Sequence, residues 1–100
     1  MAAVSPRRPT LWLFYGGARF PVDKDRFIIG RVKTTSDLVI KDPNVSRQHA
    51  AVENRGGHYV IVDMGSTNGI IHRGQRVNHH RITDGDTYYI CEHELRFGFG

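Results

Sequence analysis

The sequence has little cysteine and no long apolar run. Cys91 is the only cysteine among 100 residues, so no intrachain disulfide framework can form, and a reducing, cytoplasmic setting is expected. Because no stretch of about 18 apolar residues is present, no insertion into a membrane is predicted. Residues 1–10 contain basic residues without an apolar segment behind them and do not resemble a secretory signal. We expect them to form a flexible tail ahead of a single domain over residues 11–100.

Helical periodicity is also missing. No window keeps apolar residues at a spacing of 3.6, whereas short alternating runs bounded by glycine recur along the chain. Gly16-Gly17 and Gly56-Gly57 each separate two such runs and predict hairpins. About ten short strands in 100 residues favour an all-β fold, an antiparallel sandwich or barrel. The alternation predicts that the inward side chains are Leu11, Leu13, Phe20, Val22, Phe27, Ile29, Leu38, Ile40, Ala50, Val52, Tyr59, Ile61, Tyr88, Ile90, Leu95 and Phe97.

The charge balance is mildly basic, with 14 lysine and arginine residues against 10 acidic residues and a net charge of +4. Such an excess favours anionic partners, but many domains of this size carry as much without one. The basic residues are scattered among several loops and are not interleaved with aromatic residues. We therefore predict no nucleic-acid binding.

Four segments between the predicted strands are richer in polar groups than a turn requires: residues 30–37, 42–49, 63–69 and, less distinctively, 78–86. Guanidinium, hydroxyl and amide groups, together with backbone N–H groups, are what hold a phosphate. None of these side chains is a good general base or a usual metal ligand. The residues concerned are Arg31, Lys33, Thr34, Thr35, Ser36, Asn44, Ser46, Arg47, Ser66, Thr67 and Asn68.

A serine hydrolase is one competing interpretation, because Ser46, His49 and either Asp42 or Asp63 supply the residue types. The chain has no G-x-S-x-G motif. If the segment is extended, Ser46 and His49 lie about 10 Å apart with side chains on opposite faces. A nucleophile needs its base within about 3 Å, so we predict no catalytic pair and no enzyme.

A metal site is a second competing interpretation, since the chain has six histidines. His79 and His80 are adjacent and would face opposite ways in a strand. No cysteine or carboxylate sits at the usual ligand spacing from them. We therefore predict neither a metal site nor a cofactor.

Three motifs in order resemble the signature of the forkhead-associated (FHA) domain family. They are Gly30-Arg31, Ser46-Arg47-x-His49 and Gly65-Ser66-Thr67-Asn68-Gly69. The later segments "DGDTYYI" and "LRFGF" are similar to the closing strands of that family, so the resemblance extends from about Leu11 to Phe99. It implies an eleven-stranded antiparallel β-sandwich that binds phosphothreonine peptides through loops at one end, without catalysis. Cys91 stands where relatives often carry glycine, and we expect it in a late strand away from the motif loops.

The resemblance also implies a role for each motif residue. Arg31 would contact the phosphate or the peptide backbone, and the hydroxyl and backbone N–H of Ser46 would reach phosphate oxygens beside Arg47. Thr67 would add a hydrogen bond near the phosphate, and the Asn68 amide would bond the peptide backbone. Solvated arginines, a turn serine and a simple Asn-Gly turn are the competing interpretations. Structural roles at the site, with His49 bracing the loops, fall to Gly30, His49 and Gly69.

The predicted function is a phosphothreonine-dependent protein interaction module, which implies a Ser/Thr kinase upstream. The γ-methyl group of threonine is worth only about 0.8 kcal/mol by burial. A strong preference over phosphoserine therefore requires the methyl group to fix the angle of the phosphate as well. Asn44 and Lys33 are candidates for contacts with the ligand residues that follow the phosphothreonine.

Two further hypotheses stay open. One keeps the fold but binds an unphosphorylated partner, or a second copy, through exposed residues of a sheet face. The other makes Thr10, near Arg7 and Arg8, a kinase site that docks in cis or in trans. The candidate residues for the sheet-face surface are Trp12, Phe14, Ile28 and Tyr89.

Overall fold

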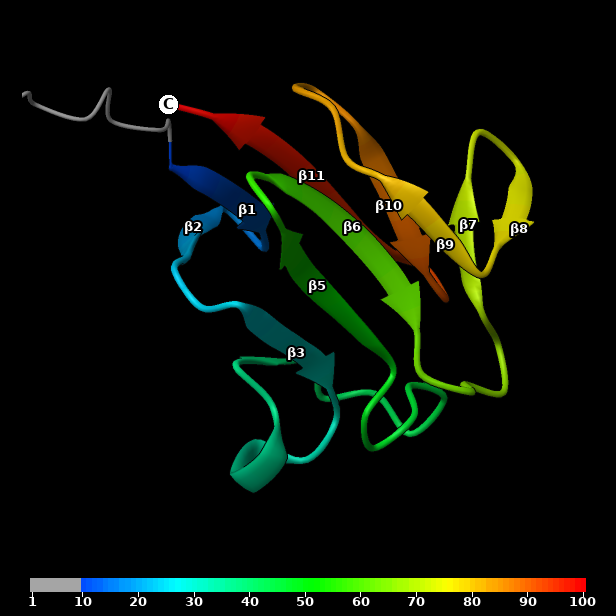
Figure 1. Cartoon of the computed structure of the whole chain (residues 1–100). Coiled ribbons are helices and arrows are strands. Elements are labelled where there is room, and N and C mark those ends of the chain that lie inside the picture. The colour runs from blue at the N-terminus through cyan, green and yellow to red at the C-terminus, as the bar shows by residue number, and fades with distance from the viewer. Residues whose placement is uncertain (1–9) are drawn as a thin grey trace, which may run out of the picture.

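The computed structural model describes residues 10–100 and consists of eleven strands and one short 3₁₀ helix, shown in Figure 1. No helix in this range is long and apolar enough to cross a membrane. In chain order the elements are β1 (Leu11–Tyr15), β2 (Ala18–Val22), β3 (Arg26–Gly30), η1 (Lys33–Thr35), β4 (Leu38–Val39), β5 (Ala50–Arg55), β6 (His58–Asp63), β7 (Ile70–His72), β8 (Gln75–Val77), β9 (His79–Arg81), β10 (Thr87–Ile90) and β11 (His93–Phe99).

The strands form a β-sandwich of two sheets, as the sequence predicts. One sheet has the order β2-β1-β11-β10-β7-β8 and the other the order β4-β3-β5-β6-β9. The glycine pairs at 16–17 and 56–57 have positive φ and connect the β1–β2 and β5–β6 hairpins, so both hairpin predictions are confirmed. The pairing is antiparallel throughout except between β3 and β4, which are parallel. Neither that pair nor η1 is predicted from the sequence.

The core between the sheets follows the predicted alternation closely. Of the predicted inward residues, only Phe20 and Tyr59 are not fully buried, and both pack against the core from its rim. Val45 and Ile82 are buried although they lie outside the strands, where alternation gives no signal. The other buried apolar residues that the pattern does not predict are Ala51, Val60 and Ile70.

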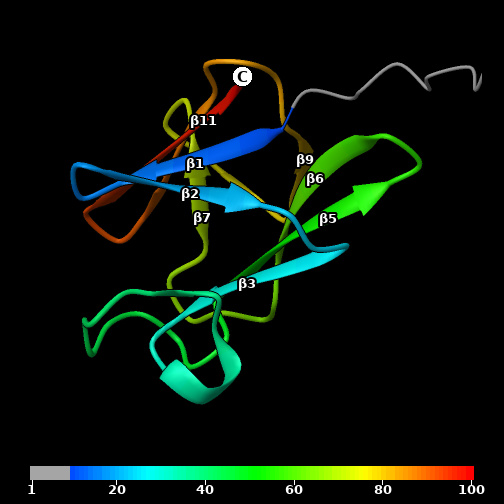
Figure 2. The same ribbon diagram turned by 90° about the vertical axis from the view of Figure 1, so that its left-hand side faces the viewer.

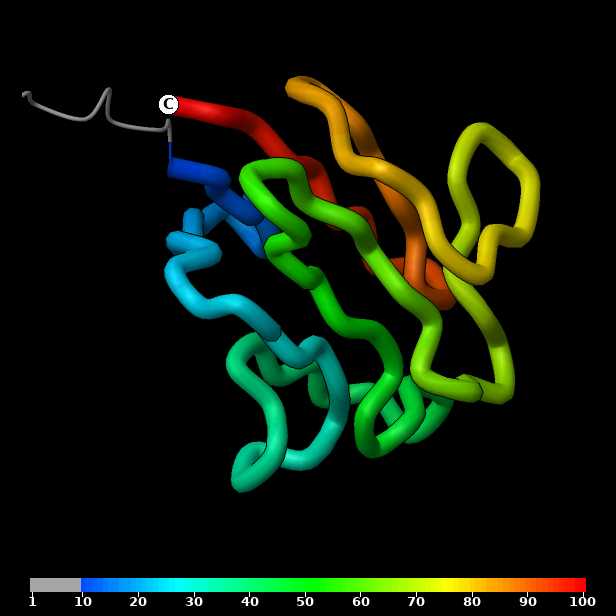
Figure 3. The backbone as a smooth tube through the Cα atoms, viewed as in Figure 1, coloured from blue at the N-terminus to red at the C-terminus, as the bar shows by residue number. Residues whose placement is uncertain are grey.

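Three of the four polar segments meet at one end of the sandwich. The β3–β4, β4–β5 and β6–β7 connections gather there, at the bottom of Figures 1 and 2, and the tube in Figure 3 shows them as neighbouring turns. The fourth segment, 78–86, contains β9 and a connection to β10 that lies at the opposite end. This less distinctive segment therefore does not contribute to the loop end of the sandwich.

The two ends of the described chain also lie away from the three loops. The backbone N–H of Gly100 donates to the carbonyl of Thr10 at 3.0 Å, which extends the β1–β11 pairing by one residue. Thr10 is exposed, but Arg7 and Arg8, which support its interpretation as a kinase site, lie outside the described residues.

Most of the predicted outward aromatic and apolar side chains are covered. The Arg19 guanidinium lies 4.4 Å from the centre of the Trp12 ring, and that of Arg96 lies 4.2 Å from the centre of the Phe14 ring. Trp12, Phe14 and Ile28 are half-buried, and Tyr89 alone of the four is exposed. The expected apolar surface on a sheet face is therefore mostly absent from the described residues.

Candidate functional site

Strand β3 carries Arg31 to the loop end of the sandwich. Gly30, the last residue of β3, is buried, and an added Cβ atom would lie only 2.1 Å from the Arg47 carbonyl oxygen. This close approach allows the Arg31 N–H to donate to the carbonyls of Ser46 and Arg47, each at 3.1 Å. The Arg31 Nε donates to the Val45 carbonyl at 3.0 Å. These bonds fix the base of the guanidinium, while its terminal nitrogens have no partner among residues 10–100.

The segment before β5 is bent, so the assumption of an extended segment is wrong. The Ser46 N–H donates to His49 Nδ1 at 3.1 Å, and His49 Nε2 donates to the Gly69 carbonyl at 2.8 Å. The ring of His49 is fully buried and both of its nitrogens bond backbone groups. The Ser46 hydroxyl oxygen instead accepts the Thr67 N–H at 3.3 Å. Ser46 and His49 therefore do not form a nucleophile–base pair, and the Ser46 amide expected at a phosphate is engaged by His49.

The third loop, between β6 and β7, is held by its own side chains. The Asp63 carboxylate accepts from both the N–H and the hydroxyl of Ser66, and the Ser66 hydroxyl oxygen accepts the Gly69 N–H at 2.9 Å. Gly69 has a φ of 77°, a conformation that favours glycine. Because β6 and β7 belong to different sheets, this segment is a crossover and not the simple Asn-Gly hairpin turn. The turn presents Thr67 and Asn68 to solvent.

These three loops line a shallow pocket of about 330 Å³. All five residues predicted to contact a ligand line it, and His49 braces the loops through Ser46 and Gly69. Sequence motifs do not point to Pro43 and Val45, which contribute to the wall. None of the lining residues is acidic. They are Arg31, Pro43, Asn44, Val45, Ser46, Arg47, Thr67 and Asn68.

Many hydrogen-bond donors of this pocket are available to a ligand. The hydroxyl groups of Ser46 and Thr67 donate to no acceptor within residues 10–100, and neither does the exposed Arg47 guanidinium. The Asn68 Nδ2 donates to the Asn44 carbonyl at 2.7 Å, which orients the amide and leaves its oxygen as an available acceptor. The pocket is therefore suited to an anion with several acceptor oxygens.

An acidic residue at the rim is held outside the pocket. Asp42 accepts the Asn44 N–H at 2.9 Å through one oxygen and bonds His93 Nε2 at 2.7 Å through the other. The bond from the Asn44 amide, followed by that from His93, keeps the pKa of Asp42 below its ordinary value. The carboxylate thus ties the β4–β5 loop to the start of β11.

Cys91 lies against the site, so its expected position away from the motif loops is wrong. Its Sγ donates to the Asn44 carbonyl at 3.4 Å and lies 3.7 Å from Asn68 Nδ2. Burial raises the pKa of the thiol. The residue has a φ of 54°, in the left-handed region, which explains why a glycine suits this position.

A larger depression of about 950 Å³ lies beside the β1–β2 turn and the β10–β11 turn. Its walls include Arg19 and Arg96 but also Glu92 and Glu94. These charges offset one another, so this depression lacks the uniform positive character of the loop pocket. The charges of the lining residues, and not the volume of the depression, therefore indicate where an anion binds.

Comparison with known proteins agrees with this geometry. The family model of the FHA domain matches residues 27–91. This chain belongs to the FHA domain family. The transcriptional regulatory protein EmbR of Mycobacterium tuberculosis is 38% identical over 87 aligned residues, which cover 81% of this chain and 21% of EmbR. The oxoglutarate dehydrogenase inhibitor of Corynebacterium jeikeium is 35% identical over 81 residues, which cover 81% of this chain and 56% of that protein.

Solved structures show the same FHA fold. The structure of Mycobacterium tuberculosis EmbR in complex with a low-affinity phosphopeptide superposes with a TM-score of 0.86 at 33% sequence identity. The match covers 92% of this chain and 25% of the EmbR chain. This FHA domain therefore spans about a fifth to a half of the length of the curated relatives it matches.

Proposed function

We propose that this FHA domain binds proteins that carry phosphothreonine, through the pocket between the three loops, and that it performs no catalysis. The observation that supports this most strongly is the pocket lining. It combines Arg31 and Arg47 with the hydroxyls of Ser46 and Thr67 and contains no acidic side chain. His49, the imidazole that braces the pocket loops, has both ring nitrogens bonded to the backbone and is not available as a general base.

A phosphate supplies the acceptor oxygens that these hydrogen-bond donors lack. A phosphothreonine carries a charge of about −1.5 to −2 and three acceptor oxygens. The terminal N–H groups of Arg31, the Ser46 hydroxyl and the Arg47 guanidinium donate to these oxygens. Hydrogen bonds to a charged group contribute about 1.5–3 kcal/mol each. An unmodified threonine offers no such acceptors, so the pocket discriminates strongly between the two forms.

The peptide backbone is the second element of recognition. The Asn68 amide is oriented by the Asn44 carbonyl, and its oxygen accepts a backbone N–H of the ligand. The Thr67 hydroxyl donates beside the phosphate. A depression of about 640 Å³ adjoins the pocket through Ser46 and Arg47 and includes the apolar side chains of Val32 and Met64. It accommodates an apolar residue that flanks the phosphothreonine.

The proposed ligand has consequences for the domain and its partners. Residues 11–100 form the binding domain, in agreement with strands that extend from Leu11 to Phe99. The partner is a protein phosphorylated by a Ser/Thr kinase, so the domain acts in an intracellular compartment where such kinases act. The structure of EmbR in complex with a low-affinity phosphopeptide supports this most directly.

A titration with paired peptides tests the proposal. A library degenerate around one fixed phosphothreonine, and the same library after phosphatase treatment, are added to the fluorescently labelled domain. We expect binding in the micromolar range for the phosphorylated library, in line with a small charged interface. Equal affinity for the two libraries would overturn the proposal.

A further inference from the structure

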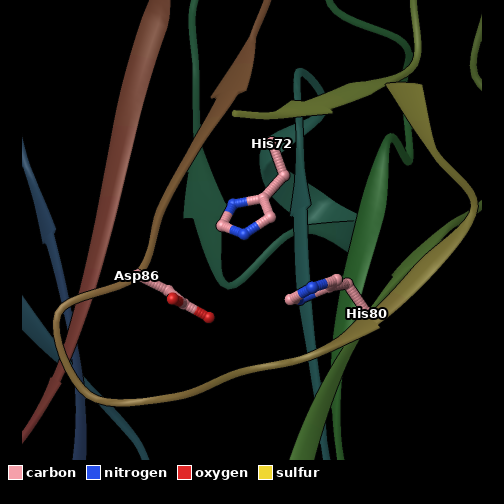
Figure 4. A group of neighbouring side chains, drawn as sticks. All are labelled: His72, His80 and Asp86. Atoms are coloured by element: carbon pink, nitrogen blue, oxygen red, sulfur yellow. The ribbon is translucent and has the colours of Figure 1, made fainter. Parts of the chain in front are cut away.

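A second cluster of polar side chains lies apart from the peptide pocket, where the two sheets approach each other. His72 ends β7 in one sheet, His80 is in the middle of β9 in the other, and Asp86 immediately precedes β10. One ligand atom from each of these side chains lies within 4.8 Å of the other two. Figure 4 shows both rings and the carboxylate converging on a common space. None of the three lines the peptide pocket.

The hydrogen bonds of the two histidines leave a lone pair on the same nitrogen of each ring. His72 Nδ1 donates to the Thr87 carbonyl at 2.9 Å. The Tyr88 hydroxyl donates to Asp86 at 3.1 Å, and it therefore accepts from His80 Nδ1, which lies 2.7 Å away. Neither Nε2 atom has a hydrogen-bond partner in the described part of the chain. A histidine that ligates a metal through one nitrogen and donates its other N–H to a protein oxygen has this arrangement.

The carboxylate is oriented in the same way. One oxygen of Asp86, Oδ2, accepts the Thr83 N–H at 2.9 Å and the Tyr88 hydroxyl. No hydrogen bond of ordinary geometry reaches the other oxygen, Oδ1, from residues 10–100. His72 and Asp86 are each only 8% exposed, so both have lost most of their contact with water.

An ion can reach the cluster from outside. A depression of about 360 Å³ is lined by His72 and Asp86 together with Arg73 and Glu94, whose charges offset each other. His80 is half-buried and closes the cluster from the side of β9. The depression thus opens onto two of the three candidate ligands.

We propose that His72, His80 and Asp86 bind a divalent transition-metal cation of the Zn²⁺ type, with a water molecule in the fourth position. Two imidazoles and one carboxylate form a donor set that suits Zn²⁺. Tetrahedral bonds of about 2.0–2.1 Å place the ligand atoms about 3.3 Å apart. A spread of up to 4.8 Å between the ligand atoms therefore requires a closure of about 1.5 Å, and the half-buried His80 has more room to move than the two buried ligands.

Binding would tie the two sheets together, because β7 and β9 lie in different sheets. The bound ion would therefore stabilise the contact between β7 of one sheet and the edge strand β9 of the other, without depending on a peptide ligand. Local spacing in the sequence does not reveal it, because the three ligands come from three separate elements. The alternation of β9 separates His80, which faces the cluster, from the exposed His79.

Calorimetric titration with ZnCl₂ tests the proposal on protein freed of metal by a chelating resin. We expect one Zn²⁺ per chain and a rise in the melting temperature. His80→Gln and Asp86→Asn should each weaken Zn²⁺ binding by at least about tenfold, since even the loss of a supporting group around a metal costs that much. His79→Gln, the matched change one residue away on the exposed side, should alter the affinity less than about twofold.

A measurement on the unaltered protein covers the case in which a variant does not fold. In ¹⁵N NMR spectra of the histidine rings, Zn²⁺ should shift the Nε2 signals of His72 and His80 and leave those of His49 and His58 in place. The absence of Zn²⁺ binding, an equal loss for His79→Gln, or shifts at other histidines would each overturn the proposal. Peptide titration of the same samples separates this result from the phosphothreonine proposal, because the two sites share no residue.

Discussion

Some atoms of Arg31 hold the loops together, and others are available to the ligand. Its backbone N–H and Nε bond the carbonyls of residues 45–47. Only the terminal nitrogens remain for a phosphate, and the same bonds hold them in place before the ligand arrives. Such pre-organisation reduces the entropy lost on binding.

We predict that Arg31→Ala weakens binding of a phosphothreonine peptide by about 10- to 100-fold, the equivalent of one or two hydrogen bonds to a charged group. Arg31→Lys should restore only part of the affinity, because an ammonium group does not reproduce the planar fork of donors. Arg81→Ala removes the same charge from an exposed position on β9 and serves as control in a calorimetric titration. An Arg31→Ala variant that binds like the Arg81→Ala variant would contradict the assignment.

His49 supports the site from beneath, and its removal should cost stability. In His49→Ala the Ser46 N–H and the Gly69 carbonyl lose their partners, at about 1–3 kcal/mol for each buried group. We therefore expect the free energy of unfolding, measured by urea denaturation, to fall by about 2–6 kcal/mol. The exposed His79→Ala should change it by less than about 0.5 kcal/mol. A similarly small effect for His49→Ala would show that the two bonds do not brace the loops.

The pair Ser46 and His49 also shows what a sequence can and cannot reveal at this scale. The motif points to both residues, and the missing G-x-S-x-G motif predicts that they form no catalytic pair. The reason given from an extended strand is wrong, because the segment bends and brings the Ser46 backbone to the ring. Which atoms of a motif meet depends on the path of a loop, and apolar alternation carries no information about that path.

At the scale of elements, the junction between β3 and the β4–β5 loop depends on Gly30. We predict that Gly30→Ala destabilises the domain by about 1–3 kcal/mol, because the new methyl group overlaps the Arg47 carbonyl and the backbone must separate. Peptide affinity should fall as well, since Ser46 and Arg47 move with that backbone. Gly98→Ala, where the nearest atom lies 3.4 Å away, is the control. Equal unfolding curves for the two variants would contradict this account.

The link that the Asp42 carboxylate makes between the β4–β5 loop and the start of β11 should depend on pH. The folded pKa of Asp42 is lowered, so its contribution to stability is present above the ordinary value of about 3.9 and is lost as the pH falls through the folded value. Asp42→Asn keeps an acceptor for the Asn44 N–H but no charge.

We therefore expect the free energy of unfolding of the wild type to fall more steeply than that of Asp42→Asn as the pH is lowered below about 4. Urea denaturation across this pH range measures the difference. The control is Asp23→Asn, which replaces an exposed carboxylate without a hydrogen bond among residues 10–100. Parallel pH profiles for the wild type and Asp42→Asn would rule out the link.

The longer strands and their hairpins can be predicted from the sequence, whereas the shortest elements cannot. Alternation and glycine pairs predict the two hairpins and nearly the whole core. The parallel β4, with two residues, and the single turn η1 are too short to produce a periodic pattern. The segment at 78–86 has polar chemistry like that of the site loops, but the crossing of the chain between sheets places it at the other end.

At the scale of the whole molecule, charge distribution selects the binding end. The net charge of +4 is spread over the chain, and the depression beside the β1–β2 and β10–β11 turns balances arginine against glutamate. The smaller loop pocket joins two arginines and has no acidic residue in its lining. The sequence motifs predict which residues gather there, but the shape of the pocket requires the folded loops.

Binding led by charge should weaken with salt. Raising NaCl from about 0.1 M to about 1 M shortens the Debye length from about 10 Å to about 3 Å. We expect the affinity for a phosphothreonine peptide to fall across this range, mostly through slower association. Stopped-flow fluorescence separates the association and dissociation rates. An association rate that does not change with salt would mean that the two arginines do not attract the ligand.

The most direct test maps the ligand onto the molecule. Backbone and side-chain NMR signals of the ¹⁵N-labelled domain are followed while a phosphothreonine peptide, and then its unphosphorylated form, is added. The phosphorylated peptide should shift the signals of Arg31, Ser46, Arg47, Thr67 and Asn68, and the unphosphorylated one should leave them unchanged at the same concentration. Shifts centred on a sheet face, or the same shifts with both peptides, would contradict the account.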